Sequence, residues 1–243
     1  MPASSLQLPQ PTFATARSLL GLTSGIAPID SLLGGLKPDT VALITGSDIR
    51  LRIAESYCVR AQLPPARGGI DGSAFFIDGG NSFDVYLFTE LARRHKLPYS
   101  RALERQLLSR AFTIYELRSL IQDSASVFAT RGPKLLVVSE VFSLFNDDVD
   151  KEEAQRVVQE MANSVSEVSK REQVPVLMTS ASRPRLLAPI LEERCNVSAE
   201  ITVDDRRFRS RLFKHAWKAP TETLAEVRPG SYNQATLEAE PNG

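Results

Sequence analysis

Four short apolar runs, the first three followed by segments with helical periodicity, constrain the fold of this chain more than any other feature. They occupy residues 41–44, 74–78, 134–138 and 174–179. Continuous apolar runs of this length are typical of strands buried on both faces, as in a parallel sheet. Two further strands are expected at 200–203 and 209–215. We therefore predict an α/β fold: a mostly parallel central sheet flanked by helices, with antiparallel strands at its C-terminal end.

Composition sets broad limits on the kind of protein. The 243 residues are 42% hydrophobic and 24% charged, with 29 basic and 29 acidic side chains. A net charge of zero argues against a protein whose whole surface binds nucleic acid, although a local basic patch remains compatible with it. Cys58 and Cys195 match no metal-ligand spacing, which indicates a reduced, intracellular protein of the cytoplasm, nucleoid or nucleus. No apolar run is long enough to span a bilayer, so we expect no membrane association.

The chain divides into three parts by composition. Residues 1–21, rich in Pro, Gln and Ser, are predicted to be a flexible lead that contains the segment Phe13-x-x-Ala16. Residues 22–230 carry the alternating strands and helices and form the expected core domain. Residues 231–243 are polar and are predicted to be a disordered tail.

The first apolar run leads into a turn and then a helical pattern, which is the layout of a phosphate-binding loop. That loop needs two glycines, a lysine and a hydroxyl in the order G-x-x-x-x-G-K-[ST]. Here Gly46 is the single matching glycine, and Ser47 follows it. If Arg50 takes the place of the lysine, the turn is short by two residues, and Leu51 stands where the hydroxyl belongs. Taken alone, the stretch predicts only a strand, a turn and a helix.

Several stretches together resemble the core of the RecA/RadA strand-exchange recombinases of archaea and eukaryotes. They are Leu22-Thr23-Ser24-Gly25 with Leu32-Leu33-Gly34-Gly35, Phe76-Ile77-Asp78, Ser109-Arg110-Ala111-Phe112, Leu135-Leu136-Val137-Val138 and Val176-Leu177-Met178-Thr179. The resemblance extends over residues 13–230 and lies in the order and spacing of these pieces. It implies a RecA-like core and a role in DNA recombination and repair.

The chain departs from that family where the family carries its chemistry. The resemblance places Gly80 at the catalytic glutamate, Ser139 at the Walker B aspartate and Ala181 at the glutamine that senses the γ-phosphate. Phosphoryl transfer depends on positioning and charge neutralisation, and each of these groups supplies one part of it. We therefore expect a degenerate nucleotide site with no catalytic residue, no bound metal and no ATP or Mg²⁺ cofactor.

Three charged residues leave an alternative open. Arg50 or Arg52 with Glu140 could form a rebuilt site, which would make the chain an ATPase with an atypical nucleotide site. We expect instead that both arginines are solvated residues at the start of a helix. Glu140 follows Ser139 directly and is expected to point to the opposite face, since consecutive strand residues alternate.

The resemblance also implies a partner. The family polymerises by inserting the Phe and Ala of an F-x-x-A segment into pockets of a neighbouring core, so Phe13 and Ala16 are the predicted partner-binding residues. The partner would be a RadA-type recombinase or another paralog. Weak, non-specific DNA binding is a further expectation, and its candidate residues are Arg183, Arg185, Arg206, Arg207, Arg209 and Arg211.

The leading hypothesis is thus a non-catalytic recombinase paralog that binds a recombinase or another paralog and assists filament assembly. The alternatives are the atypical ATPase and a stand-alone DNA-binding module that acts through residues 206–218.

Overall fold

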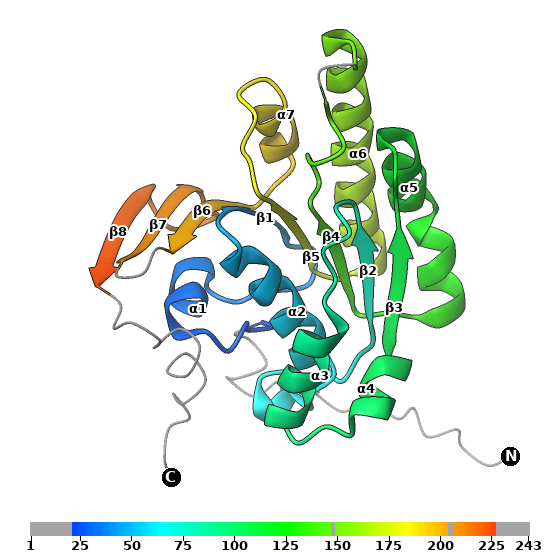
Figure 1. Cartoon of the computed structure of the whole chain (residues 1–243), viewed down its shortest axis with the longest axis vertical. Helices are drawn as coiled ribbons and strands as arrows, with labels where there is room; N and C mark the ends of the chain where they lie inside the picture. Colours follow the sequence, from blue (N-terminus) through cyan, green and yellow to red (C-terminus); the bar gives the residue numbers. More distant parts are fainter. Residues whose placement is uncertain (1–20, 147–148, 204–206, 227–243) are drawn as a thin grey trace, which may run out of the picture.

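The computed structural model describes residues 21–146, 149–203 and 207–226. Its centre is one eight-stranded sheet with the strand order β3-β2-β4-β5-β1-β6-β7-β8 (Figure 1). The strands from β3 to β6 in this order run parallel, and β7 and β8 are antiparallel additions. The predicted α/β class, with a mainly parallel sheet and C-terminal antiparallel strands, is confirmed.

The strands are β1 (Val41–Gly46), β2 (Ala74–Asp78), β3 (Gln106–Arg110), β4 (Leu135–Ser139), β5 (Val176–Ser180), β6 (Val197–Val203), β7 (Arg207–Lys214) and β8 (Thr221–Glu226). The α-helices are α1 (Ala27–Leu33), α2 (Ile49–Ala61), α3 (Val85–Arg94), α4 (Tyr99–Glu104), α5 (Ile114–Arg131), α6 (Lys151–Glu172) and α7 (Ala188–Glu193). A short 3₁₀ helix, η2, covers Pro65–Arg67.

Two hydrophobic cores lie on the two faces of the sheet. Alternate residues of β1 show the division: Ala42 and Ile44 belong to the core with α1 to α4, and Val41 and Leu43 to the core with α5 to α7. Every residue of β2, β4 and β5 is buried, as expected for strands covered on both sides. The continuous apolar runs in the sequence therefore reflect burial between two layers of helices (Figure 1).

Side-chain caps fix where three of the helices begin. The side chain of Asp84 accepts from the backbone N–H groups of the first turn of α3, and that of Asp150 does the same for α6. At α5, Thr113 Oγ1 accepts from Glu116 N at 3.1 Å while Glu116 Oε2 accepts from Phe112 N at 2.8 Å. This arrangement resembles a capping box, except that Glu116 reaches the residue before the N-cap.

The strands β6, β7 and β8 extend the sheet beyond α1 (Figure 1). One face of β7 carries Ser210 and Leu212, which are buried, and Leu212 belongs to the core with α1 and α2. The other face carries Arg207, Arg209 and Arg211, which are exposed. The alternation places all three arginines on the solvent side of the extension.

Two short helices were not predicted as elements. Residues 99–104 form α4, and Ala188–Glu193 form α7 in a segment expected to be a loop with one helical turn. Both have six residues, too few for an apolar period to be visible. The lead before residue 21, with Phe13 and Ala16, lies outside the described residues, as do most of the expected tail and Arg206. No helix in the described part of the chain is long and apolar enough to cross a membrane.

Candidate functional site

The structure brings the predicted nucleotide-site residues together at one edge of the sheet. Gly46 ends β1, Ser139 ends β4, Gly80 follows β2, and Ala181 follows β5. These four strands are parallel, so their carboxyl ends meet at one edge, where ligands bind in open α/β sheets. The four predicted positions thus lie at the same edge, and the contacts of the side chains around them differ from the expectation.

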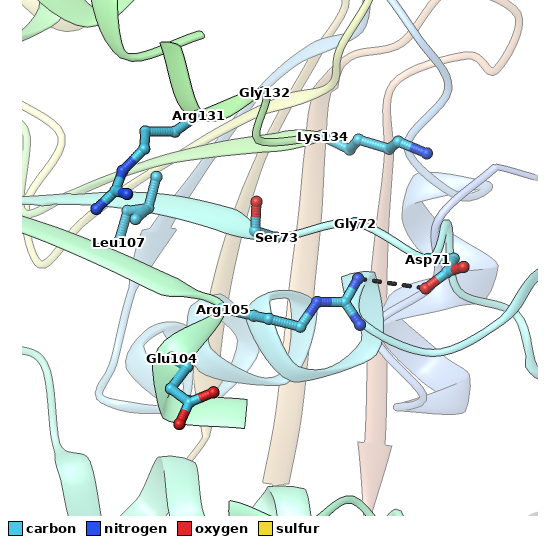
Figure 2. Close-up of a pocket in the computed structure, with 9 residues that line it drawn as sticks. All are labelled: Asp71, Gly72, Ser73, Glu104, Arg105, Leu107, Arg131, Gly132 and Lys134. Atoms are coloured by element: carbon cyan, nitrogen blue, oxygen red, sulfur yellow. Dashed lines mark hydrogen bonds and ion pairs between the residues drawn. The ribbon is translucent and has the colours of Figure 1, made fainter. Parts of the chain in front are cut away.

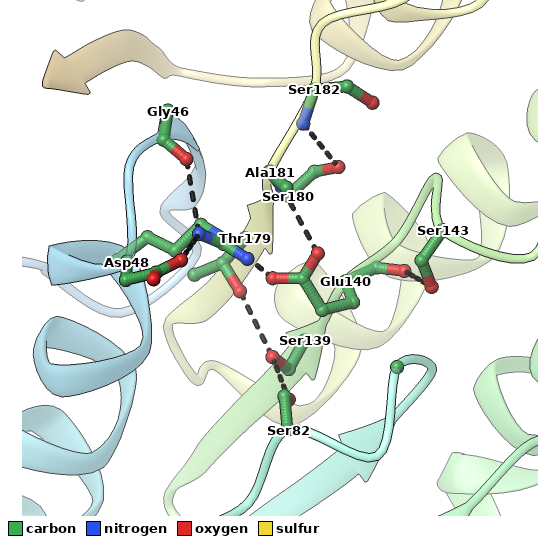
Figure 3. A network of polar contacts seen from close by, with 12 residues as sticks. Gly46, Asp48, Ser82, Ser139, Glu140, Ser143, Thr179, Ser180, Ala181 and Ser182 are labelled. Atoms are coloured by element: carbon green, nitrogen blue, oxygen red, sulfur yellow. Dashed lines mark hydrogen bonds and ion pairs between the residues drawn. The ribbon is translucent and has the colours of Figure 1, made fainter.

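Arg50 is buried at the centre of this edge, with 7% of its surface exposed. Its Nε donates to Glu140 Oε1 at 2.6 Å, and its Nη1 donates to Gly46 O at 3.2 Å and to Asp48 Oδ1 at 2.9 Å (Figure 3). The guanidinium thus links the start of α2 to the end of β4. The prediction of a solvated arginine was wrong, because its main partner lies 90 residues further along the chain.

Glu140 completes this ion pair from beyond the end of β4. Its φ of 57° is in the left-handed region, which non-glycine residues seldom adopt. This conformation ends the strand alternation and directs the side chain toward Arg50 instead of the opposite face, so that expectation was also wrong. Its second oxygen, Oε2, accepts from Ala181 N at 3.1 Å, and the residue is 5% exposed (Figure 3). Both carboxylate oxygens are therefore engaged within the protein.

Gly80 provides the space that Glu140 occupies. A Cβ atom at position 80 would lie 2.6 Å from both Cβ and Cγ of Glu140, closer than real side-chain atoms approach. The absence of a side chain at residue 80 and the presence of one at residue 140 are thus geometrically linked. A glutamate at position 80 does not fit beside the observed Glu140.

The turn after β1 is hydrogen-bonded to β6. Ser47 N donates to Ile201 O at 2.9 Å, and Ser47 Oγ accepts from Val203 N at 2.9 Å. Gly46 has a φ of 120°, and a Cβ there would lie 2.1 Å from Ile201 O. The amide and hydroxyl of Ser47, groups a phosphate-binding loop would aim at its ligand, are therefore used to hold the turn against the sheet.

Hydroxyl groups line the carboxyl ends of β2, β4 and β5. Ser139 Oγ lies 2.7 Å from Ser82 Oγ and 3.2 Å from Thr179 Oγ1, which gives a chain of hydrogen bonds across the three strands (Figure 3). Ser139 is fully buried. Its neutral hydroxyl satisfies its neighbours and brings no negative charge for a cation.

The buried carboxylate of Asp78 organises the loop after β2. It accepts from the backbone N–H groups of Gly80, Ser82 and Phe83 at 2.9–3.2 Å. Burial alone would raise the pKa of Asp78, but the hydrogen bonds from Ser82, Phe83 and Gly80 outweigh it and hold the pKa below its ordinary value. Asp78 is thus an ionised structural group of the loop that carries Gly80.

The residues at this edge do not fit a magnesium–triphosphate. Such a ligand needs a free cation, a hydroxyl for the metal and a carboxylate near it. Here Arg50 is paired with Glu140, Ser47 is bonded to β6, and Ser139 carries no charge. Within the described ranges, no group of three or more His, Cys, Asp or Glu side chains is arranged to hold a metal ion.

Sequence reasoning missed a second buried titratable group on α2. Glu55 is 1% exposed; its Oε1 accepts from Asp84 N at 2.7 Å, and its Oε2 has no hydrogen-bond partner among the described residues. Burial raises the pKa of Glu55 to about 8. Burial likewise lowers the pKa of the half-buried Arg52, whose Nη2 also finds no hydrogen bond within the described part. The charged neighbours of Arg52 are Glu90, Arg94 and Glu55, so it lies apart from the Arg50–Glu140 pair. The prediction that Arg52 is a solvated residue was also wrong, because its side chain is half-buried.

The predicted DNA-binding arginines of β7 alternate with acidic neighbours. In the sheet register, Arg211 lies opposite Glu200 on one side and Glu222 on the other, and directly opposed residues share a face. Arg209 Nε is 3.8 Å from Glu222 Oε1. The exposed face is consequently a mixed surface rather than a purely basic one.

The other two described arginine candidates lie in the segment after β5 and differ from each other. Arg183 forms two hydrogen bonds to Glu192, at 2.8 and 2.7 Å, and its guanidinium stacks over Phe213 at 4.2 Å. Arg185 is exposed. Arg183 therefore has a structural role, and Arg185 is the arginine of this segment that faces solvent.

A separate hollow of about 370 Å³ lies at the amino ends of β2, β3 and β4, the edge opposite the site. Arg105, Arg131 and Lys134 line it, and Arg105 Nη2 pairs with Asp71 Oδ1 at 3.2 Å (Figure 2). The side chains of Arg131 and Lys134 extend in different directions (Figure 2). They do not converge on one point where a ligand would be held.

Comparison with known proteins supplies the family. Residues 15–186 match the family model described as Rad51. The chain belongs to the Rad51 family. It is 26% identical over 190 residues to the human meiotic recombination protein DMC1/LIM15 homolog. This match covers 72% of this chain and 56% of the relative. It is 26% identical over 138 residues to DNA repair protein RAD51 homolog 1 of Arabidopsis thaliana, covering 56% of this chain and 40% of the relative.

The resemblance to a RecA/RadA-type recombinase core is thereby confirmed. The chain spans about half the length of the curated relatives it matches. Membership places it in a family of recombination and DNA repair proteins, whereas its own activity and partners are matters for proposal.

Proposed function

We propose that this Rad51-family protein neither binds nor hydrolyses ATP and acts in recombinational repair as an interaction protein. It binds a recombinase or another paralog of the family and assists filament assembly. The observation that carries this proposal is the buried pair between Arg50 and Glu140, which occupies the edge where a nucleotide would be held.

The energetics of that pair support the proposal. Removing one partner of a buried ion pair costs roughly 3–5 kcal/mol, because the other charge is left uncompensated. A nucleotide that drew Arg50 away from Glu140 would incur a cost of this kind. At 1.4 kcal/mol for each factor of ten, its affinity would fall by roughly a hundredfold or more.

The same pair weighs against the rebuilt ATPase. That alternative needs Arg50 to meet a phosphate while Glu140 acts near the metal or the attacking water. With the two side chains 2.6 Å apart and both buried, each neutralises the other. Gly80, whose space Glu140 takes, leaves no room for a replacement carboxylate.

The partner surface follows from the lead segment and the sheet edge. Phe13 and Ala16 precede the core, and an apolar anchor in a polar lead suits insertion into a partner's pockets. On the core itself, β3 ends the sheet, so its outer edge meets no other described strand. Its Leu108 is 45% exposed. This edge suits the addition of an extended segment from a family partner.

Calorimetric titration with Mg²⁺–ATP tests the nucleotide part of the proposal. We expect no binding in the micromolar range and no phosphate release, with an active recombinase as the positive control. Micromolar affinity accompanied by turnover would reverse the proposal in favour of the atypical ATPase.

A pull-down against the recombinase of the same organism tests the partner part. The full chain should capture the recombinase, and Phe13→Ala should reduce capture strongly, because it removes the anchor side chain. Leu8→Ala, in the same lead, is the matched control and should leave capture unchanged. Equal capture by wild type and Phe13→Ala would eliminate the docking model.

DNA binding is a second, weaker candidate, favoured by the three exposed arginines of β7 together with Arg185. The acidic neighbours Glu200 and Glu222 limit the net charge of that face. We therefore expect non-specific binding that weakens steeply as salt is raised.

A further inference from the structure

The carboxylate of Glu140 holds together three segments that are distant in sequence. One oxygen accepts from Arg50 at the start of α2, and the other accepts from Ala181 N directly after β5. The Arg50 guanidinium and the dipole of α2 both favour a negative charge near the start of this helix. Glu140 thus presents an anion where this topology favours binding one.

The segment from Ala181 to Leu187 is tied down at each of its parts. Glu140 holds its first backbone N–H, and Arg183 in its middle is bound by Glu192 and stacked on Phe213. At its end, Leu187 is buried and its N–H donates to Pro184 O at 3.2 Å. Arg185 and Leu186 remain exposed on this ordered segment.

Two local features show that the position of Glu140 is imposed by its contacts. A non-glycine residue with φ of 57° carries backbone strain. The close approach to Gly80 also forbids any side chain there. Such features persist only where surrounding interactions over-determine them, and here those interactions are the contacts with Arg50 and Ala181.

We propose that the Glu140 carboxylate is a built-in substitute for a bound phosphate, which holds residues 181–187 in one arrangement with or without nucleotide. This inference rests on the proposed function, in which the nucleotide edge is closed by the chain's own side chains. Its consequence is that the exposed Arg185 and Leu186 keep one arrangement whether or not nucleotide is present.

Hydrogen exchange of the full chain tests the idea at the amides of residues 181–187. In wild type, exchange there should be the same with and without Mg²⁺–ATP. In Glu140→Ala, it should rise by about tenfold or more, the factor that corresponds to losing one hydrogen bond to a charged group. Glu193→Ala, which alters an exposed carboxylate on neighbouring α7, is the matched control and should behave as wild type.

Added anions provide a readout that a merely structural role would not give. Glu140→Ala removes the acceptor of Arg50 Nε and of the Ala181 N–H. Sodium acetate or inorganic phosphate should therefore restore slow exchange in 181–187. Neither anion should change the wild type. If Glu140→Ala does not fold, Glu140→Gln serves instead, and its weakened pairing with Arg50 should speed exchange in 181–187 several-fold.

Three outcomes would overturn the inference. They are unchanged exchange at 181–187 in the variants, an equal rise throughout the chain, and slower exchange of the wild-type segment on adding Mg²⁺–ATP. Failure of the proposed function looks different: Mg²⁺–ATP would bind the wild type in calorimetry, or the recombinase would not be captured, whatever the exchange of this segment.

Discussion

Arginines occupy two opposite environments in this protein. Arg50 is buried at the carboxyl edge of the sheet and neutralised by Glu140 at 2.6 Å. Arg207, Arg209 and Arg211 alternate along β7 on a solvent-exposed face. The side chains carry the same charge in both places. Burial and pairing differ, and they decide how accessible each guanidinium is to a ligand.

The difference shows that burial and pairing, and not charge alone, set what an arginine can bind. At the carboxyl edge, the charge of Arg50 is neutralised within the protein by Glu140. On β7, Arg209 Nε lies 3.8 Å from Glu222 Oε1, and both side chains are more than half exposed. Exposed pairs of this kind contribute little to stability, so these arginines can exchange partners readily.

The largest effect is expected from Glu140→Ala. The change removes the buried carboxylate that neutralises Arg50 and leaves the exposed Asp48, so it should lower the free energy of unfolding by about 3–5 kcal/mol. Urea denaturation would measure it.

The matched control is Glu222→Ala, which breaks the exposed contact with Arg209 and should cost less than about 1 kcal/mol. Similar costs for the two variants would remove the contrast between the two environments.

Gly80→Ala should have the next largest effect. The new methyl group would meet Cβ and Cγ of Glu140 at 2.6 Å, and overpacking of this kind costs about 1–3 kcal/mol. Thermal or urea unfolding would measure the loss.

A double-mutant cycle sharpens this prediction. In a Glu140→Gly background the clash is gone, so adding Gly80→Ala should then cost much less. Equal costs in both backgrounds would mean that the two positions are not coupled.

Glu55 extends the comparison to a buried carboxyl group that forms no ion pair with a cationic side chain among the described residues. Its pKa, raised from 4.5 to about 8 by burial, means that the folded state keeps a proton that the unfolded state has lost between these pH values. Stability therefore falls as pH rises through this window, by about 2 kcal/mol between pH 6 and pH 8. Urea midpoints at the two pH values would measure the loss.

Glu55→Gln should abolish most of this pH dependence, because the amide does not titrate and can still accept from Asp84 N. A variant whose stability falls with pH as steeply as wild type would assign the effect to another group.

The smallest effect concerns the exposed arginines. Glu222→Gln removes a negative charge beside Arg209 and should strengthen DNA binding slightly at low salt. Arg209→Ala should weaken it and reduce the slope of log affinity against log salt by about 1 if Arg209 contacts a phosphate. Fluorescence anisotropy over a salt series would measure both, and identical slopes for all variants would exclude this face as a DNA-binding surface.

Much of the fold was predictable because local signals and burial agree. The apolar runs of β1, β2, β4 and β5 and the capping-box spacing at Thr113 are short-range features, and each predicted element is present. The six-residue helices α4 and α7 were missed because their stability comes from packing rather than from a visible period.

The candidate site was predictable in position but not in content. The ends of the buried strands can be predicted from the apolar runs. In a parallel sheet these ends meet at one edge, which is where Gly46, Gly80, Ser139 and Ala181 lie. The Arg50–Glu140 pair depends on a left-handed residue and on a contact across 90 positions, and neither leaves a local pattern.

The contact between Gly80 and Glu140 has a consequence for anyone who wishes to rebuild an ATPase from this chain. Introducing a glutamate at residue 80 first would collide with Glu140, and removing Glu140 first would strand Arg50. Each single substitution is therefore expected to lower the free energy of unfolding. Positions 80 and 140 would therefore have to be changed together, and Arg50 would need another acceptor for its Nε.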